Sequence, residues 1–115
     1  MKHINVCGTS VPVRVGSEKT DSRLKDAYGL YDLDTGVIWI NESTPVGMRD
    51  AILAHEVLHV ILNSSGALRV TAMAFGLSCD KPRDLKRMNE WEEAIIRILT
   101  PGVLEAFGAA RTSGK

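Results

Sequence analysis

AHEVLHVIL, residues 54–62, places two histidines and a glutamate inside an otherwise apolar run. On an α-helix, residues four apart lie on one face, so His55 and His59 would project side by side. Glu56 follows His55 by one position, about 100° around the helix. Burying three polar groups in apolar surroundings without partners is costly. A metal ion held by the two imidazoles would offset that cost.

The H-E-x-x-H spacing of this run is typical of zinc metallopeptidases. Neutral imidazole is a good ligand for Zn²⁺, and a catalytic zinc keeps one open position for water, whose pKa it lowers to about 7. Glu56 can stand beside the metal without ligating it and act as the general base. The sequence therefore predicts His55 and His59 as metal ligands, Glu56 as the catalytic residue and Zn²⁺ as the cofactor.

A catalytic zinc usually has three protein ligands, so the third must come from another segment. The candidates are His3, Asp80, Asp84, Glu90, Glu92 and Glu93. The best source is NEWEEAIIRIL, residues 89–99, in a helix whose expected buried stripe comprises Met88, Ile95, Ile96 and Leu99. Glu92 shares the face of this stripe, so we predict Glu92 as the third ligand, with Glu93 second. The alternative for any one of these glutamates is an ordinary solvated position.

The segments before this run have the alternation of β-strands. Apolar residues alternate with polar ones at Ile4 and Val6 and again at Val11, Val13 and Val15. In YGLYDLDTGVIWIN, residues 28–41, two such segments flank Asp34-Thr35-Gly36, which has the composition of a turn. This pattern predicts a β-hairpin.

The period becomes helical at residue 43. Ser43 or Thr44 can cap a helix that has Pro45 in its first turn, and Gly66 is the expected end. We expect further helices over residues 67–75, from Pro82 through residue 99, and over 102–107, the last capped by Thr100-Pro101. Strands followed by helices indicate an α+β fold, with a small antiparallel or mixed sheet packed on the helix of His55 and His59.

The composition is that of an ordinary globular domain. The 115 residues are 44% hydrophobic and 24% charged, and 14 basic residues balance 14 acidic ones. We expect one domain over residues 1–110, a flexible tail over 111–115, and no partnership with nucleic acid or membrane. Two distant cysteines, Cys7 and Cys79, predict reduced thiols in the cytoplasm. Trp39 and Trp91 are expected in the core.

Three segments carry a resemblance to a known family: YDLDTGVIWINESTP, RDAILAHEVLHVIL and EEAIIRILTPGVLEAF, within residues 28–107. They resemble zinc metallopeptidases of the gluzincin type, and the short chain is similar to phage and prophage proteins near the ImmA/IrrE group. The resemblance implies a zincin-like fold, zinc bound by His55, His59 and Glu92, and Glu56 as general base. The chain departs from that group in lacking its E-x-x-A-N-x-F-A segment and a DNA-binding domain, which argues against a role in controlling a repressor.

These observations together predict a minimal zinc-dependent peptidase, phage-derived and acting in the bacterial cytoplasm. Its polypeptide substrate would add a strand to the edge of the predicted hairpin. Two alternatives remain at this point: a catalytically silent binding protein with the same fold, and a zinc hydrolase that cleaves a non-peptide amide.

Overall fold

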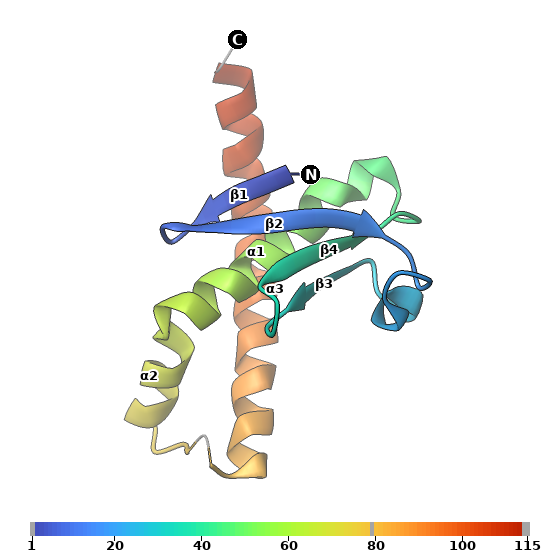
Figure 1. Cartoon of the computed structure of the whole chain (residues 1–115). Helices are drawn as coiled ribbons and strands as arrows, with labels where there is room; N and C mark the ends of the chain where they lie inside the picture. The colour runs from blue at the N-terminus through green and yellow to red at the C-terminus, as the bar shows by residue number, and fades with distance from the viewer. Residues whose placement is uncertain (1, 79, 114–115) are drawn as a thin grey trace.

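The computed structural model describes residues 2–78 and 80–113, and the side chains of residues 2–78 and 80–105. Its elements in chain order are β1 (Lys2–Val6), β2 (Thr9–Gly16), the short 3₁₀ helix η1 (Ser22–Asp26), β3 (Gly29–Asp32), β4 (Val37–Asn41), the 3₁₀ turn η2 (Val46–Met48), α1 (Arg49–Ser65), α2 (Ala67–Ala74) and α3 (Pro82–Ser113). Figure 1 shows the sheet together with the three helices. The arrangement confirms the predicted α+β class.

The four strands form one mixed sheet in the order β1-β2-β4-β3. β1 pairs antiparallel with β2, and β3 pairs antiparallel with β4 in the predicted hairpin. The central pair, β2 and β4, is parallel, with Val13 opposite Ile38. β3 therefore lies at one edge of the sheet, with β4 on one side only.

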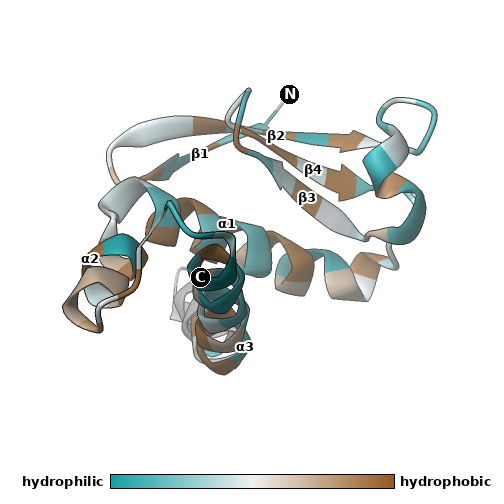
Figure 2. Cartoon of the chain, turned by 90° about the horizontal axis from the view of Figure 1, so that it is seen from below, coloured by the Kyte–Doolittle hydropathy of each residue, from teal (hydrophilic) through white to brown (hydrophobic). Residues whose placement is uncertain are grey.

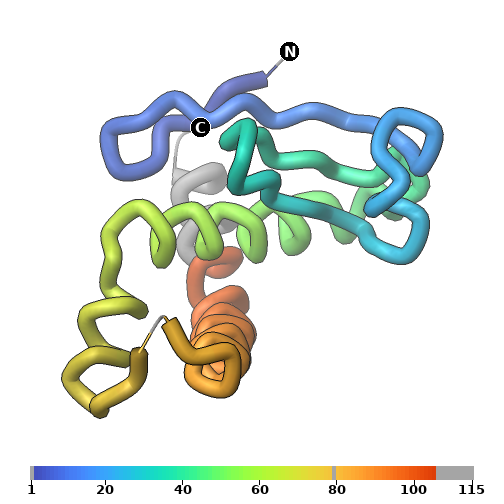
Figure 3. The backbone as a smooth tube through the Cα atoms, turned by 60° about the horizontal axis from the view of Figure 1, so that its bottom comes forward, coloured from blue at the N-terminus to red at the C-terminus, as the bar shows by residue number. Residues whose placement is uncertain are grey.

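The core lies between the sheet and α1. Ile38 and Ile40 on β4 belong to one cluster of buried hydrophobic residues together with Val60 on α1. Figure 2 shows the sheet on one side of α1, while α2 and α3 lie on the other, and the tube in Figure 3 shows the same layering. Because α1 is covered on both sides, its polar residues can be held in place by the sheet and by α3.

The two tryptophans do not anchor this core, so that prediction was wrong. Trp39 alternates with Ile38 and Ile40 and is half-buried on the other face of the sheet, where the Arg14 guanidinium lies 5.9 Å from its ring centre. Trp91 is half-buried on α3 and meets Phe75 edge-to-face, with ring centres 5.8 Å apart. Strand alternation places Trp39 outside because its neighbours fill the inner face.

Helix α1 begins later than the sequence predicts. The Thr44 hydroxyl donates to the Tyr28 carbonyl at 3.1 Å, and the Ser43 hydroxyl donates to Oδ1 of Asn41 at 2.9 Å. Both hydroxyls thus tie the loop to the sheet, and neither caps a helix, so the predicted cap was wrong. The end at Gly66 is confirmed, since this residue takes a left-handed conformation with φ 68°.

Helix α3 is continuous, which corrects the predicted break at Thr100-Pro101. Pro101 lies inside the helix, and the Thr100 hydroxyl donates to the Ile96 carbonyl at 2.6 Å instead of capping a new helix. The backbone is helical through Ser113, so residues 111–113, expected in a flexible tail, belong to α3. Residues 114–115 lie outside the described part of the chain.

Within residues 2–78 and 80–113, no single helix is long and apolar enough to cross a membrane. Among these residues, only the helical segments 46–65 and 67–74, taken together across the bend between them, have that length and composition. Cys7 is a free, exposed cysteine in the tight connection between β1 and β2. Cys79 lies outside the described residues.

Candidate metal centre

The two histidines of the H-E-x-x-H motif lie on successive turns of α1, so their side chains adjoin, as the sequence predicts. The ring centres of His55 and His59 lie 5.0 Å apart. Their side chains are 35% and 18% exposed, so both reach solvent from a helix that is otherwise held between two layers. Glu56 is turned toward the sheet and is only 6% exposed.

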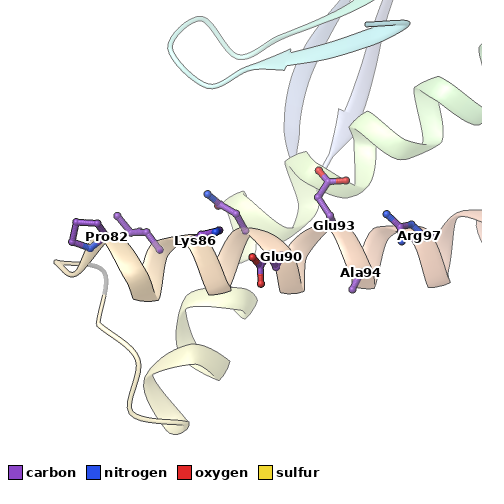
Figure 4. A pocket seen from close by; sticks show the side chains of 8 residues that line it. Pro82, Lys86, Glu90, Glu93, Ala94 and Arg97 are labelled. Carbon is purple, nitrogen blue, oxygen red and sulfur yellow. The ribbon is translucent and has the colours of Figure 1, made fainter.

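The carboxylate that faces both histidines is that of Glu93 on α3. One of its oxygens lies 3.0 Å from Nε2 of His59, and the other lies 3.6 Å from Nε2 of His55. One ligand atom from each of these three residues falls within 4.8 Å of the other two. Figure 4 shows Glu93 directed from α3 toward α1. This spacing allows one small cation to contact two imidazoles and a carboxylate.

Glu92, the predicted third ligand, occupies a different place. Its Oε1 lies 3.3 Å from Nδ1 of His59, the ring nitrogen on the opposite side from Glu93. The side chain of Glu92 is 14% exposed, against 50% for Glu93. Glu92 therefore lies within the contact between α1 and α3, and Glu93 lies at the border of that contact, where an ion can be reached from solvent.

The remaining candidates lie away from the histidine pair. Glu90 points away from α1 in Figure 4. Asp84 is buried, but its carboxylate accepts a hydrogen bond from the backbone N–H of Ser78 at 2.9 Å at the start of α3. His3 on β1 and Asp80 before α3 are exposed. None of these four belongs to the cluster of ligand atoms within the described residues.

The helical phase expected for α3 was partly wrong. Met88 and Ile96 are buried as predicted, but Leu99 is 45% exposed. The buried side runs through Met88, Glu92 and Ile96, which are four residues apart, and Glu93 lies about 100° round the helix from its centre. Glu92 lies on the buried stripe, as predicted, but the adjacent Glu93 is the residue that faces both histidines.

The electrostatic environment favours a neutral His55. Burial, followed by the positive field of His59, lowers the pKa of His55, while Glu93 raises it and Arg97 lowers it further. An imidazole must be neutral to donate its lone pair to a metal ion. His55 is therefore suited to ligation near neutral pH.

Glu56 has the opposite perturbation. Burial raises the pKa of its carboxyl to about 7, Glu93 also raises it, and His59 together with the backbone N–H of Tyr31 lowers it. A carboxyl with a pKa near neutrality can both accept and release a proton under working conditions. The geometry and the pKa together distinguish Glu56 from the exposed glutamates.

A cavity of about 440 Å³ opens beside these residues. Its walls combine the edge strand, α1 and α3, and they include Gly29, Leu30, Tyr31, Leu33, His55, Glu56, His59, Asn63, Asn89, Glu92 and Glu93. A neighbouring hollow of about 650 Å³ along α3 shares Asn89 and Glu93 with it and is shown in Figure 4. Glu93 thus stands where the two hollows meet.

Sequence reasoning missed three parts of this site. Asn63 lies four residues after His59 and shares its face, a relation that the spacing alone could have shown. Gly29 interrupts a predicted strand, which is a sign of close backbone approach: a Cβ there would overlap Cγ2 of Ile52 and lie 3.4 Å from Cγ of Glu56. No sequence signal indicates that the backbone N–H of Tyr31 donates a hydrogen bond to the Glu56 carboxylate.

Comparison with known proteins agrees with this geometry. The model of the peptidase M78 family, described as the IrrE N-terminal-like domain, matches residues 6–87. The match contains His55, Glu56 and His59 and ends before Glu92 and Glu93. No curated protein and no solved structure matches the chain. Since the family model covers well over half of the sequence, the chain belongs to the peptidase M78, or IrrE N-terminal-like, family.

Proposed function

We propose that the protein is a zinc-dependent peptidase whose metal ion is held by His55, His59 and Glu93. The observation that carries this proposal is the convergence of one ligand atom each from His55, His59 and Glu93 within 4.8 Å, next to a buried glutamate. Two imidazoles and one carboxylate are a common donor set for catalytic zinc, so the residues fit the metal. Glu93 replaces Glu92 in the ligand set predicted from the sequence.

A bound Zn²⁺ would supply Lewis acidity, polarising the scissile carbonyl and acidifying water. Glu56, buried beside the histidines, would take the proton of the attacking water and pass it to the leaving amine. The N–H of Tyr31 favours the charged form of Glu56 before the proton arrives. The walls from α1 and the edge strand keep Glu56 largely dry, which strengthens these electrostatic effects.

The edge strand gives the substrate a docking position. β3 has β4 on one side only, and its residues Gly29, Leu30 and Tyr31 line the cavity with the metal-site residues. An extended polypeptide that adds a strand to β3 would lie beside the cavity that His55 and His59 line. We therefore keep a polypeptide as the proposed substrate, and the phage origin and cytoplasmic location stay predictions from the sequence.

The test compares zinc-loaded wild type with Glu56→Gln on unfolded protein substrates. Wild type should hydrolyse them, and Glu56→Gln should be inactive while retaining zinc and a cooperative thermal transition, because glutamine cannot accept the proton. Bound zinc should raise the melting temperature of both proteins, since a ligand of the folded state stabilises it.

The other outcomes separate the remaining functions. Zinc binding without cleavage of any polypeptide would favour a binding protein that keeps the fold and the metal. Cleavage of non-peptide amides alone would favour the second alternative. Loss of zinc from Glu56→Gln would show that Glu56 is a ligand and that the assigned roles are wrong.

A further inference from the structure

Glu92 is enclosed on the side of His59 that faces away from Glu93. Its Oε1 lies 3.3 Å from Nδ1 of His59 and accepts a hydrogen bond from Nδ2 of Asn63 at 3.1 Å. The side chains of Glu92 and His59 are only 14% and 18% exposed. A carboxylate in such surroundings is held by the donors that reach it.

Asn63 fixes this carboxylate relative to α1. Its Nδ2 also donates to the backbone carbonyl of His59 at 2.8 Å, one turn earlier on the same helix. One amide group therefore connects the backbone that carries His59 with the carboxylate that contacts the ring of His59. The three residues form a closed set of contacts between α1 and α3.

We propose that Glu92 is a positioning residue that holds His59 with its proton on Nδ1 and its Nε2 lone pair directed toward His55 and Glu93. When a metal ion occupies Nε2, the hydrogen of the neutral ring is on Nδ1, and Oε1 of Glu92, 3.3 Å away, is placed to accept it. A carboxylate in this position also fixes the ring orientation of a metal ligand and raises its basicity. The inference rests on the proposed metal centre for its function. In the metal-free protein Glu92 at Nδ1 competes for the ring hydrogen with Glu93, which lies 3.0 Å from Nε2.

Three variants on α3 test the assignment. Glu92→Ala removes the acceptor, Glu92→Gln keeps an Oε1 that can accept the same hydrogen bond, and Glu90→Ala removes an exposed carboxylate from the same helix as a control. We measure the zinc dissociation constant of each by competition with a chromophoric chelator. Glu92→Ala should weaken zinc binding by about 10- to 100-fold, Glu92→Gln should recover most of the loss, and Glu90→Ala should match wild type.

The second readout is ¹⁵N NMR of the His59 ring in zinc-loaded and in metal-free protein, the latter in mildly alkaline buffer. Zinc-loaded wild type should show a hydrogen on Nδ1. In metal-free wild type the two carboxylates should share the ring hydrogen between both nitrogens, and Glu92→Ala should shift it toward the tautomer with hydrogen on Nε2. A zinc-loaded wild-type ring with its hydrogen on Nε2, or equal zinc affinity and an equal metal-free tautomer in wild type and Glu92→Ala, overturns the proposal. If wild type binds no zinc, the proposed function fails, and the metal-free tautomer still decides the role of Glu92.

Discussion

Glu56 combines deep burial with a charge that general-base chemistry requires. Its side chain sits under β3 with 6% exposure, and this burial is the main reason that its pKa rises to about 7. The His59 ring and the Tyr31 N–H oppose the rise. Burial of Glu56 thus lowers the stability of the fold and at the same time raises the pKa of its carboxyl. Strongly perturbed pKa values of this kind are typical of catalytic sites.

The cost of Glu56 should appear in the pH dependence of stability. In the metal-free chain, its pKa rises from 4.5 to about 7 on folding, so the folded state binds more protons between these values. The stability contributed by protonated Glu56 is fully present below pH 4.5 and is lost as the pH rises through about 7.

Denaturant titrations from acidic to mildly alkaline pH, on metal-free wild type and Glu56→Gln, measure this effect. The free energy of unfolding of wild type minus that of Glu56→Gln should fall with pH by up to about 3 kcal/mol. The opposite contribution of His55, whose pKa is lowered, is present in both proteins and cancels in the difference. A difference that stays flat over this range would contradict the burial argument.

The residues of α1 were predictable because their relation is local. Positions 55, 56 and 59 are fixed relative to one another by helical geometry alone, so the motif predicts which side chains adjoin, and the roles it suggests for them belong to the proposed function. The third ligand depends on how α3 rotates against α1, a tertiary quantity. Glu92 lies within the helix contact and faces Nδ1 of His59, whereas the more exposed Glu93 faces Nε2 of both histidines.

At the scale of elements, the close contact between β3 and α1 brings Glu56 to the edge strand. Gly29 permits it, because any Cβ would overlap Cγ2 of Ile52. Gly29→Ala should therefore destabilise the fold by about 1–3 kcal/mol, the usual range for overpacking, and reduce hydrolysis by displacing β3 from Glu56. Gly47→Ala is the matched control, since a Cβ there meets nothing within 4 Å. Equal denaturation midpoints for the two variants would show that β3 does not pack this closely.

Helix α3 gives a second prediction at this scale. A proline inside a helix lacks a hydrogen-bond donor and crowds the preceding turn, at a cost of about 3 kcal/mol. Pro101 is exposed, so replacing it removes no core packing. Pro101→Ala should raise the free energy of unfolding by roughly 1–3 kcal/mol and leave the helix content by circular dichroism unchanged or slightly higher. Destabilisation by this variant would indicate that Pro101 starts a separate helix, as the sequence predicts.

The elements themselves were largely predictable. The hairpin of β3 and β4 follows from alternation around Asp34-Thr35-Gly36, and the end of α1 follows from Gly66. The start of α1 was not predictable, because Ser43 and Thr44 have tertiary partners that compete with capping. The continuity of α3 through Pro101 likewise overrides a local signal, since a proline is favourable in a first turn and unfavourable inside a helix.

At the scale of the molecule, the site exists only where three layers meet. The sheet covers Glu56 on one side of α1, which carries both histidines. Helix α3 supplies the carboxylates of Glu92 and Glu93 on the other side. The family match ends at residue 87, so the contribution of α3 rests on packing and distances in the structure and not on the match. The proposed function therefore depends on whether Glu93 and the two histidines hold one ion.

Anomalous diffraction at the zinc absorption edge, from crystals of zinc-loaded protein, tests this dependence most directly. We expect one strong peak per chain, about 2 Å from Nε2 of His55, Nε2 of His59 and a carboxylate oxygen of Glu93, with Glu92 on Nδ1 of His59. A peak ligated by Glu92 in place of Glu93, or no peak beside these histidines, would contradict the account.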